Sequence, residues 1–274
     1  MSGKSAKDQN DFKRRYGTWA LVAGASEGLG AAYANQLAAR GLNLFLIARR
    51  KELLKALSSK LTAEYKVQVR TLSLDLSGPD AAERVEQSAA GLDIGLLIYN
   101  AAFSAVGPFL DHSMEDHLKE IDTNIRSPLA LTYLFGQRML EKGRGGILLM
   151  SSLSAFQGSA FISNYSATKA FNMLLAEGLW EEWRRQGVDV LVCMAGATNT
   201  PNYQASSPSR TGRFSDSTLE PDQVVSEALG AIGRQPHVIP GRSNRFTSFV
   251  MRHLMPRQLA IQFMGRILRD MYIH

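Results

Sequence analysis

Two side chains able to move a proton, Tyr165 and Lys169, stand four residues apart. Residues at that spacing share one face of a helix, so the phenol and the ammonium can point into the same cleft. The unperturbed pKa of tyrosine is about 10, and a nearby lysine charge lowers it by stabilising the phenolate, which suits proton transfer. Many helices carry such a pair as a solvated surface contact, so the neighbouring motifs must decide between the two interpretations.

A glycine-rich segment near the start of the chain is typical of a phosphate-binding turn. Residues 24–30 read GASEGLG, follow a short apolar run and precede an alanine-rich stretch. Glycine lets the backbone approach a pyrophosphate, and the N-terminus of the following helix supplies amide donors. A glycine-rich connection without a ligand is the alternative. We predict a dinucleotide site formed by Gly24, Ser26, Glu27, Gly28, Leu29 and Gly30.

Arg49 and Arg50 lie just after the second predicted strand, where the adenosine ribose sits in dinucleotide-binding folds. Arginine pairs with a 2′-phosphate, whereas an acidic residue would bind a 2′-hydroxyl. Ser26 can add a hydrogen bond to the phosphate, although the negative charge of Glu27 opposes it. The alternative is that both arginines are only the basic start of a surface helix. The pattern favours NADP(H) over NAD(H).

Polar side chains close several predicted strands at the edge where a cofactor crevice is expected. Ser151 and Ser152 end the fifth strand, where a hydroxyl can bind a substrate carbonyl or cap a strand or helix. Asp75 ends the third strand and either accepts from an adenine amino group or caps the helix that Pro79 starts. Asn100 also follows a predicted strand, but taken alone it is explained equally well as a polar residue of a turn as by a role in the crevice.

Apolar runs alternate with helical stretches along most of the chain. Strands are predicted at 18–23, 42–48, 67–74, 94–99, 146–150 and 188–194, with an edge strand at 237–239. Helices are predicted at 29–40, from 51 to 64, at 79–90, at 114–141 with a kink at Pro128, around Tyr165 up to 187, and from Pro221. Residues 199–219 are predicted to be a mobile loop. This alternation predicts an α/β fold with a doubly wound parallel sheet.

The composition is that of an ordinary globular protein: 274 residues, 45% hydrophobic and 20% charged. We expect a basic flexible tail at 1–17, a single dinucleotide-binding catalytic domain at 18–240 and an amphipathic basic helical extension at 241–274. The net charge of +6 concentrates at the two ends, so the nearly neutral body is not expected to bind nucleic acid. There is no secretory pattern and no apolar stretch long enough to span a membrane. The single cysteine, Cys193, lies in an apolar run, which indicates a buried strand thiol and a reducing, cytoplasmic location.

The C-terminal extension carries two apolar stripes separated by Pro256. The first contains Phe246, Phe249, Val250 and Leu254, and the second contains Leu259, Ala260, Phe263, Met264, Ile267 and Leu268. Arginines occupy the other faces, and a basic amphipathic hairpin can bind an anionic membrane surface or an acyl chain. We favour the alternative, in which both stripes pack on the body, on the 199–219 loop or on a partner subunit. The loop and the helices would then cover an apolar substrate pocket.

In this order and spacing, the motifs at 24–30, 75–76 and 99–102, with Ser152, Tyr165 and Lys169, resemble the short-chain dehydrogenase/reductase family. The resemblance is to its compact single-domain branch and covers roughly residues 17–240. It implies a Rossmann-type fold and a catalytic set of Asn124, Ser152, Tyr165 and Lys169, with Asn124 carried over from the run DTN at 122–124. Tyr165 would exchange a proton with the substrate oxygen, and Ser152 would polarise the carbonyl. Lys169 would bind the nicotinamide ribose and lower the tyrosine pKa, and Asn124 would hold a water in a relay to the lysine.

The resemblance extends the cofactor-binding set, and no metal is expected. The added residues are Asp75, Leu76, Asn100, Ala101, Ala102, Tyr165, Lys169, Gly196, Thr198 and Thr200. The family's Asn-Asn-Ala-Gly is Tyr-Asn-Ala-Ala here, so Ala102 adds a methyl group near the cofactor. The family's Pro-Gly after the sixth strand is Ala-Gly at 195–196, which leaves a less rigid loop and either Thr198 or Thr200 to contact the nicotinamide amide.

The expected function is NADP(H)-dependent hydride transfer between the nicotinamide and a ketone or secondary alcohol. A hydrophobic substrate is favoured, such as a 3-oxoacyl, steroid-like or aromatic compound. One alternative is a non-catalytic NADP(H)-binding sensor or scaffold, a class that usually lacks the tyrosine or the lysine. Another is a nucleotide-sugar epimerase or dehydratase, which resembles a longer branch. The resemblance also implies a homodimer or homotetramer formed through the helices at about 114–141 and 164–186.

Overall fold

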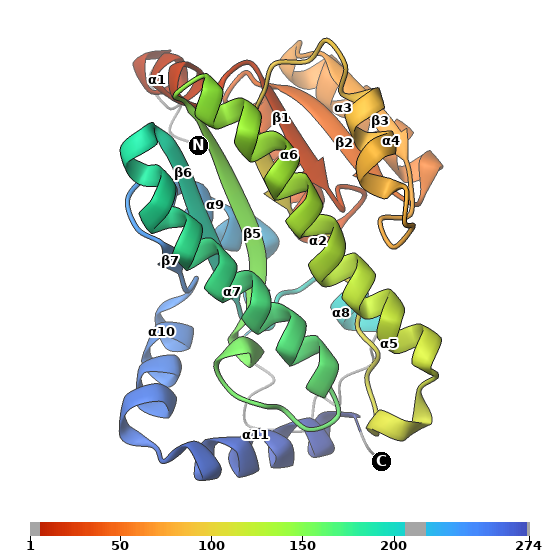
Figure 1. Cartoon of the computed structure of the whole chain (residues 1–274), viewed down its shortest axis with the longest axis vertical. Coiled ribbons are helices and arrows are strands. Elements are labelled where there is room, and N and C mark those ends of the chain that lie inside the picture. Colours follow the sequence, from red (N-terminus) through yellow and green to blue (C-terminus); the bar gives the residue numbers. More distant parts are fainter. Residues whose placement is uncertain (1–5, 206–217, 273–274) are drawn as a thin grey trace.

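A computed structural model describes residues 6–205 and 218–272. Within these residues, seven parallel strands form one sheet in the order β3-β2-β1-β4-β5-β6-β7 (Figure 1). The strands are β1 (Trp19–Ala23), β2 (Asn43–Ala48), β3 (Val69–Ser73), β4 (Ile94–Tyr99), β5 (Gly145–Ser152), β6 (Val188–Ala195) and β7 (His237–Val238). The order reverses between β1 and β4, which opens a crevice at the carboxyl ends of the strands. The predicted doubly wound, Rossmann-type fold is confirmed.

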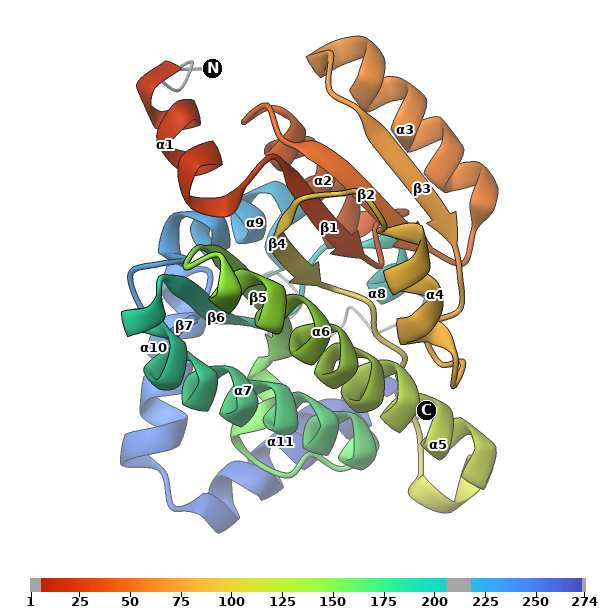
Figure 2. The ribbon, with the colours of Figure 1, turned by 45° about the horizontal axis from the view of Figure 1, so that its top comes forward.

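Helices cover both faces of the sheet, which explains why its central strands are apolar on both sides. One face carries α2 (Gly28–Ala38), α3 (Lys51–Tyr65) and α9 (Pro221–Ala231), and the other carries α4 (Ala81–Ser88), α6 (Ser127–Glu141) and α7 (Ser163–Trp183) (Figures 1 and 2). Each face has its own apolar core, with Tyr33 of α2 buried in one and Phe135 of α6 in the other. Cys193 is buried in β6, as predicted.

The helix predicted at 114–141 is interrupted where Asn124 lies. α5 (Met114–Ile121) passes into a π-helical turn (Asp122–Arg126) before α6 begins. Pro128 has no amide hydrogen to donate to the carbonyl of Asn124, four residues earlier. The α-helical hydrogen-bond pattern is therefore interrupted by a π-helical turn before the proline. That carbonyl instead accepts a hydrogen bond from the Asn172 amide of α7 at 3.0 Å. The irregularity therefore fixes Asn124 against α7.

The described part of the N-terminal segment, from residue 6 on, is not the flexible tail predicted over 1–17. α1 (Ala6–Tyr16) docks at the amino ends of the strands (Figure 1). Tyr16 is buried and donates to the Asp189 carboxylate at 2.8 Å, and Arg15 binds the same carboxylate through two nitrogens at 2.5 and 2.7 Å. This contact could not be predicted from the basic composition of the segment, because its acidic partner, Asp189, lies in β6, far away in the sequence. Residues 1–5 lie outside the described part of the chain.

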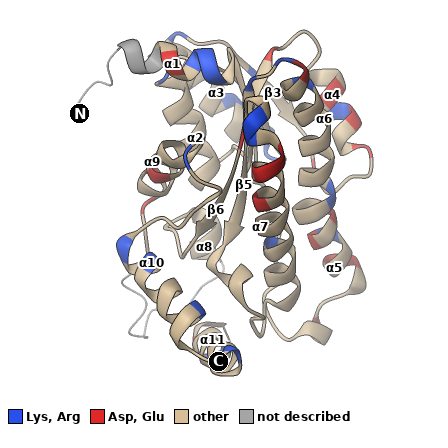
Figure 3. Cartoon of the chain, turned by 60° about the vertical axis from the view of Figure 1, so that its left-hand side comes forward, with Lys and Arg blue, Asp and Glu red and all other residues tan. Residues whose placement is uncertain are grey.

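Two helices form the C-terminal extension. α10 (Arg242–Phe249) continues into a π-helical turn (Val250–Leu254), and α11 (Arg257–Tyr272) crosses below the carboxyl ends of the strands (Figure 1). Figure 3 marks Lys and Arg positions in blue on both helices. Across the described ranges, no helix is both long and apolar enough to cross a bilayer.

The two apolar stripes of the extension differ in burial. Ala260 and Leu268 of α11 are buried, whereas Phe246, Phe249 and Leu254 are 70%, 55% and 69% exposed. The packing that we favoured for both stripes is therefore found for α11, except at its exposed Leu259, and not for the first stripe in this single chain. Between β6 and α9 the structure describes α8 (Pro201–Ala205) and a bridge from Thr198 to Leu219. The rest of the loop predicted to be mobile, 206–217, lies outside the described residues.

Candidate active site

A cleft of about 540 Å³ opens at the carboxyl ends of the strands, and most of the predicted site residues line it. Most of the predicted cofactor-binding residues line the cleft. They are Gly24, Ser26, Glu27, Gly28, Leu29, Arg49, Arg50, Asp75, Leu76, Asn100, Ala101, Ala102, Gly196, Thr198 and Thr200. Ser152, Tyr165 and Lys169 line the same cleft. Gly30 and Asn124 do not line it, because both are buried behind its wall.

The glycine turn packs against the end of β4 so closely that side chains are excluded. A Cβ on Gly30 would lie 1.9 Å from the Gly24 carbonyl oxygen, and a Cβ on Gly24 would lie 2.6 Å from the Ala101 nitrogen. Gly24 also has a φ of 79°, in the left-handed region that favours glycine. The Asn100 amide donates to the Gly24 carbonyl at 2.9 Å and ties the turn to β4. Gly30 thus supports the turn from beneath.

The N-terminus of α2 is suited to an anionic ligand. Its N-cap residue, Glu27, makes no side-chain capping hydrogen bond, so the first-turn amides receive no acceptor from it. These amides and the positive end of the helix dipole match a pyrophosphate. Thr200 lies across this end, with its methyl carbon 2.9 Å from where a Cβ on Gly28 would be. The residues present therefore fit a dinucleotide.

The two predicted arginines have different surroundings. Arg50 forms an ion pair with Glu27, with a nitrogen–oxygen distance of 2.5 Å, and donates to the Ser26 hydroxyl at 3.1 Å. This pair neutralises the Glu27 charge that we expected to oppose a 2′-phosphate. Arg49 also lines the cleft, and no carboxylate in the described part of the chain forms an ion pair with it. Arg49 is therefore the cation available to an anionic ligand.

Asp75 forms a local turn and does not cap a helix. Its carboxylate accepts hydrogen bonds from the Ser77 amide at 3.0 Å and from the Ser77 hydroxyl at 2.9 Å. α4 begins only at Ala81, with Asp80 as its N-cap residue. The helix-cap interpretation of Asp75 is therefore wrong, and the carboxylate remains at the cleft beside Leu76.

β5 and α7 bring Ser152, Tyr165 and Lys169 to the same cleft. Ser152 ends β5, and its hydroxyl accepts a hydrogen bond from the Ser154 amide at 3.2 Å. Lys169 is 3% exposed and donates to the Met150 carbonyl at 3.1 Å, with its nitrogen 5.4 Å from the centre of the Tyr165 ring. The helical spacing therefore does place the phenol and the ammonium together.

Burial moves the ionisations of this pair in opposite directions. Desolvation raises the pKa of Tyr165 to about 12, the negative charge of Glu120 adds to the rise, and Ser152 opposes it. Desolvation lowers the pKa of Lys169 to about 8, against the charge of Glu120, which raises it. The lowered tyrosine pKa that we expected is thus not found, because burial of the phenol and the charge of Glu120 both raise it. A phenol that keeps its proton can serve as an acid toward a substrate oxygen.

Asn124 holds the wall of the cleft together. Its side-chain oxygen accepts from the Phe103 amide at 2.9 Å, and its side-chain nitrogen donates to the Phe103 carbonyl at 2.8 Å and to the Thr168 hydroxyl at 3.1 Å. These contacts join the loop after β4 to the catalytic helix α7. Among the described residues, no hydrogen bond connects Asn124 directly to Lys169.

α11 supplies part of the cleft that no sequence motif marked. Met271 and Tyr272 line it together with Met264, Ile267 and Leu268 of the second apolar stripe. Met271 and Tyr272 could have been found from the helical spacing, because the apolar stripe continues every three or four residues to position 272.

The extension also touches the rest of the site. Arg252 stacks over the Phe156 ring at 4.3 Å, and Arg269 lies over the Phe161 ring at 5.9 Å, so both hold the loop before α7. Asn244 of α10 packs against Gly196, where a Cβ would lie 2.7 Å from the Asn244 amide nitrogen. The extension therefore braces both the catalytic loop and the cofactor loop.

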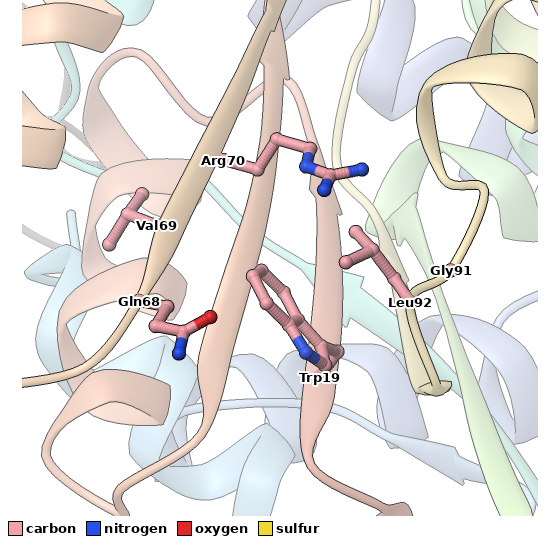
Figure 4. Close-up of a pocket in the computed structure, with 6 residues that line it drawn as sticks. All are labelled: Trp19, Gln68, Val69, Arg70, Gly91 and Leu92. Carbon is pink, nitrogen blue, oxygen red and sulfur yellow. The ribbon is translucent and has the colours of Figure 1, made fainter.

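A second hollow, at the amino ends of the strands, has no such chemistry (Figure 4). It is lined by Trp19, Gln68, Val69, Arg70, Gly91 and Leu92. The Arg70 guanidinium donates to the carbonyls of Ser88 and Ala90 at 2.8 and 3.3 Å, which satisfies the carboxyl end of α4. We assign this hollow a structural role.

Similarity to known proteins supports the assignment of the cleft. The family model of short chain dehydrogenases matches residues 18–211. A 7beta-hydroxysteroid dehydrogenase of Clostridium sardiniense is 32% identical over 237 residues, which cover 86% of this chain and 90% of that protein. A very-long-chain 3-oxoacyl-CoA reductase of Bos taurus is 33% identical over 223 residues, which cover 80% of this chain and 70% of that protein.

Solved structures agree with these sequence matches. A structure from a study of 7beta-hydroxysteroid dehydrogenase stereoselectivity has a TM-score of 0.87 and 30% identity, covering 92% of this chain and 98% of that one. A short-chain dehydrogenase from Sphingobium yanoikuyae in complex with NADPH has a TM-score of 0.75 and 30% identity, covering 84% of this chain and 91% of that one. The chain therefore belongs to the short-chain dehydrogenase/reductase family and is an oxidoreductase that acts on CH–OH groups by hydride transfer with a nicotinamide cofactor.

Proposed function

We propose that the chain is an NADP(H)-dependent reductase of hydrophobic ketones, able to oxidise the corresponding secondary alcohols. The observation that carries the proposal is the convergence of Ser152, Tyr165 and Lys169 on the cleft that also holds the glycine turn. When bound, the nicotinamide would supply or accept the hydride. Tyr165 would give its proton to the carbonyl oxygen, and Ser152 would donate a hydrogen bond to that oxygen. Lys169 would bind the nicotinamide ribose, and Asn124 would keep α7 in position.

The preference for NADP(H) follows from charge at the end of β2. Arg49 lines the cleft without an ion-pair partner among the described residues, and Arg50 with Ser26 lies beside it. A 2′-phosphate would give these groups a charged partner, whereas a bare ribose would leave Arg49 with none. The NADPH complex of the Sphingobium yanoikuyae protein supports the same cofactor.

The hydrophobic substrate follows from the other side of the cleft. Met264, Ile267, Leu268 and Met271 of α11, with Ile162 before α7, give this side an apolar lining. Apolar contact area of this kind binds a large hydrocarbon skeleton and leaves the polar groups to orient its carbonyl. The steroid and long-chain acyl compounds in the names of the relatives have such skeletons. We therefore propose a steroid-like or 3-oxoacyl ketone as the substrate class.

Self-association through α5, α6 and α7 is the assembly that we propose. Leu118, Leu129, Tyr133 and Leu174 on these helices are 51%, 43%, 67% and 63% exposed. Large apolar side chains gathered on neighbouring helices are typical of a subunit interface. Light scattering on the wild type and on Tyr133→Glu tests this, and we expect the variant to dissociate.

The cofactor proposal is tested by fluorescence titration with NADPH and NADH. Arg49→Ala should weaken NADPH binding by about ten- to a hundredfold and leave NADH binding unchanged, because only NADPH carries the 2′-phosphate. Arg50→Ala should have a smaller effect, because Arg50 is already paired with Glu27. Lys51→Ala, one residue further at the exposed start of α3, is the matched control. Equal binding of NADPH and NADH by the wild type would contradict NADP(H) preference.

The catalytic proposal is tested by NADPH oxidation with a panel of hydrophobic ketones. Tyr165→Phe should lower kcat by about a hundred- to ten-thousandfold with little change in NADPH affinity, because only the proton donor is removed. Tyr65→Phe, which removes a hydroxyl on α3 that does not line the cleft, should have no effect on kcat. Tight NADPH binding without turnover of any ketone or alcohol would favour the alternative, a non-catalytic sensor or scaffold.

A further inference from the structure

Three titratable side chains gather behind the cleft, on α5 and just before it, and the proposed reaction does not use them. They are His112, His117 and Glu120, and none of the three lines the cleft. Each has a buried polar atom without a hydrogen-bond partner: Nε2 of His112, Nδ1 of His117 and Oε2 of Glu120. Buried polar atoms are normally satisfied, so three unsatisfied ones on nine residues of chain call for an explanation.

Glu120 is the most deeply placed of the three. Its side chain is fully buried, and one carboxylate oxygen accepts a hydrogen bond from the Ala105 amide at 3.3 Å. In the part of the chain that the structure describes, no Lys or Arg forms an ion pair with it. Burial raises the Glu120 pKa, while the Ala105 amide, Asn164, His117 and His112 lower it. A buried carboxyl without an ion-pair partner is destabilising, so a structural role alone does not account for it.

The histidines are held close to this carboxyl. His117 lies three residues before Glu120 on α5, so the two share a helix face. Its Nε2 bonds to the Phe109 carbonyl at 2.9 Å and its ring stacks on Phe109 with centres 4.2 Å apart, which leaves Nδ1 as the unsatisfied atom. The His112 ring meets the His117 ring edge-on at 6.2 Å. The cluster therefore has a fixed geometry.

The cluster also borders the catalytic helix. Asn164, which precedes Tyr165 on α7, donates to the His117 carbonyl at 3.1 Å. The negative charge of Glu120 acts on both Tyr165 and Lys169 and raises the pKa of each. The groups that face Glu120 are thus the two histidines from its own segment, the Ala105 amide from the loop after β4, and Asn164, Tyr165 and Lys169 from α7.

We propose that Glu120 is a positioning residue whose buried charge acts through the wall of the cleft and keeps Tyr165 and Lys169 in their protonated forms. The inference rests on the proposed function, because it concerns the same tyrosine and lysine. A protonated Tyr165 is the form that gives a proton to a carbonyl, and a protonated Lys169 is the form that binds a ribose. The charge therefore extends ketone reduction to higher pH.

The test is the pH profile of kcat/KM for ketone reduction in the wild type, Glu120→Gln and Glu115→Gln. Removal of the Glu120 charge should move the alkaline fall of activity to lower pH by on the order of one pH unit, because both neighbouring groups then lose their protons more readily. Glutamine keeps an oxygen for the Ala105 amide, so the fold is retained. Glu115 lies on the same helix but is exposed, and its variant controls for the change in net charge. Glu120→Asp keeps the charge and should restore most of the wild-type profile.

A superimposable profile for Glu120→Gln and the wild type would overturn the inference while the proposed function stands. A wild type that binds NADPH but turns over no ketone would instead contradict the proposed function. The inference is then decided by NADPH affinity against pH. The loss of affinity on deprotonation of Lys169 should occur on the order of one pH unit lower in Glu120→Gln, and an unchanged midpoint overturns the inference.

A stability measurement separates this role from a purely structural one. The folded-state pKa of Glu120 is raised, so the folded wild type loses stability as pH rises above the unfolded-state value of about 4.3. The melting temperature of Glu120→Gln should therefore rise relative to that of the wild type as pH increases above about 4.3. A constant difference between the two proteins would contradict a buried, costly carboxyl at position 120.

Discussion

The cofactor side and the substrate side of the cleft are built in different ways. On the cofactor side, backbone atoms set the shape: the Gly24 carbonyl packs over Gly30, and the Ala101 amide packs against Gly24. On the substrate side, side chains of α11 set the shape, and of these Leu268 is buried whereas Ile267 is half-buried. The first side permits one residue type at key positions, while the second requires only apolar volume.

The difference separates what the two sides have to recognise. A pyrophosphate is bound by main-chain amides at fixed positions, so the chain must follow one path. A hydrocarbon skeleton is bound by contact area, which many combinations of apolar side chains can provide. We expect substitutions on the cofactor side to affect folding and binding together, and substitutions on the substrate side to affect only the choice of substrate.

Gly30→Ala should have the largest effect of the changes considered. Its Cβ would lie 1.9 Å from the Gly24 carbonyl oxygen, which is backbone and cannot rotate away. We expect a loss of about 3 kcal/mol in the free energy of unfolding, together with loss of detectable NADPH binding. Chemical denaturation and fluorescence titration measure the two effects.

Gly178→Ala provides the matched control for that experiment. Gly178 lies within α7, and a Cβ there would meet no atom within 4 Å. Alanine is the better helix former, so this variant should be more stable than the wild type by about 0.5–1 kcal/mol. Normal NADPH binding by Gly30→Ala would show that the turn can rearrange and that the two sides of the cleft are equally adaptable.

The same difference explains how far the sequence could predict the molecule. The strand order and the cleft residues of the cofactor side were predictable, because glycines and polar residues at strand ends have few other uses. The burial of α1 was not, since it depends on Asp189, which is remote in sequence. The roles of Met271 and Tyr272 and of the Glu120 cluster were also not predictable, because each depends on which helix face meets the body.

Lys169→Met tests how much folding stability the protein loses by burying a cation between the cofactor side and the substrate side of the cleft. At neutral pH the folded wild type must hold a charge that burial disfavours, and the lysine pKa falls from 10.5 to about 8. Removing the charge alone should stabilise the protein by about 3 kcal/mol at pH 7. The Met150 carbonyl loses its hydrogen-bond donor in the variant, so we expect a net stabilisation of about 2 kcal/mol. Activity should be lost, which would make the variant more stable and inactive.

The pH dependence of this gain has a definite sign. Between about pH 8 and 10.5 the unfolded chain binds more protons at this lysine than the folded one, so wild-type stability rises with pH in that window. The advantage of Lys169→Met should therefore shrink as pH rises from 8 toward 10.5, as followed by thermal denaturation. A gain that is independent of pH would assign the stabilisation to packing and not to the buried charge.

Ile267→Ser should have the smallest effect and the most selective one. Ile267 lines the cleft, so the variant should raise KM for a bulky hydrophobic ketone by about tenfold, which corresponds to the loss of about 1.4 kcal/mol of apolar contact. NADPH affinity and turnover of a small ketone should stay at wild-type values, because neither depends on the Ile267 side chain. Leu259→Ser, at a position of the same helix that is 52% exposed, should change neither constant. If Leu259→Ser raised KM as much as Ile267→Ser, the substrate would be bound by the outer face of α11, and the contrast between the two sides of the cleft would lose its basis.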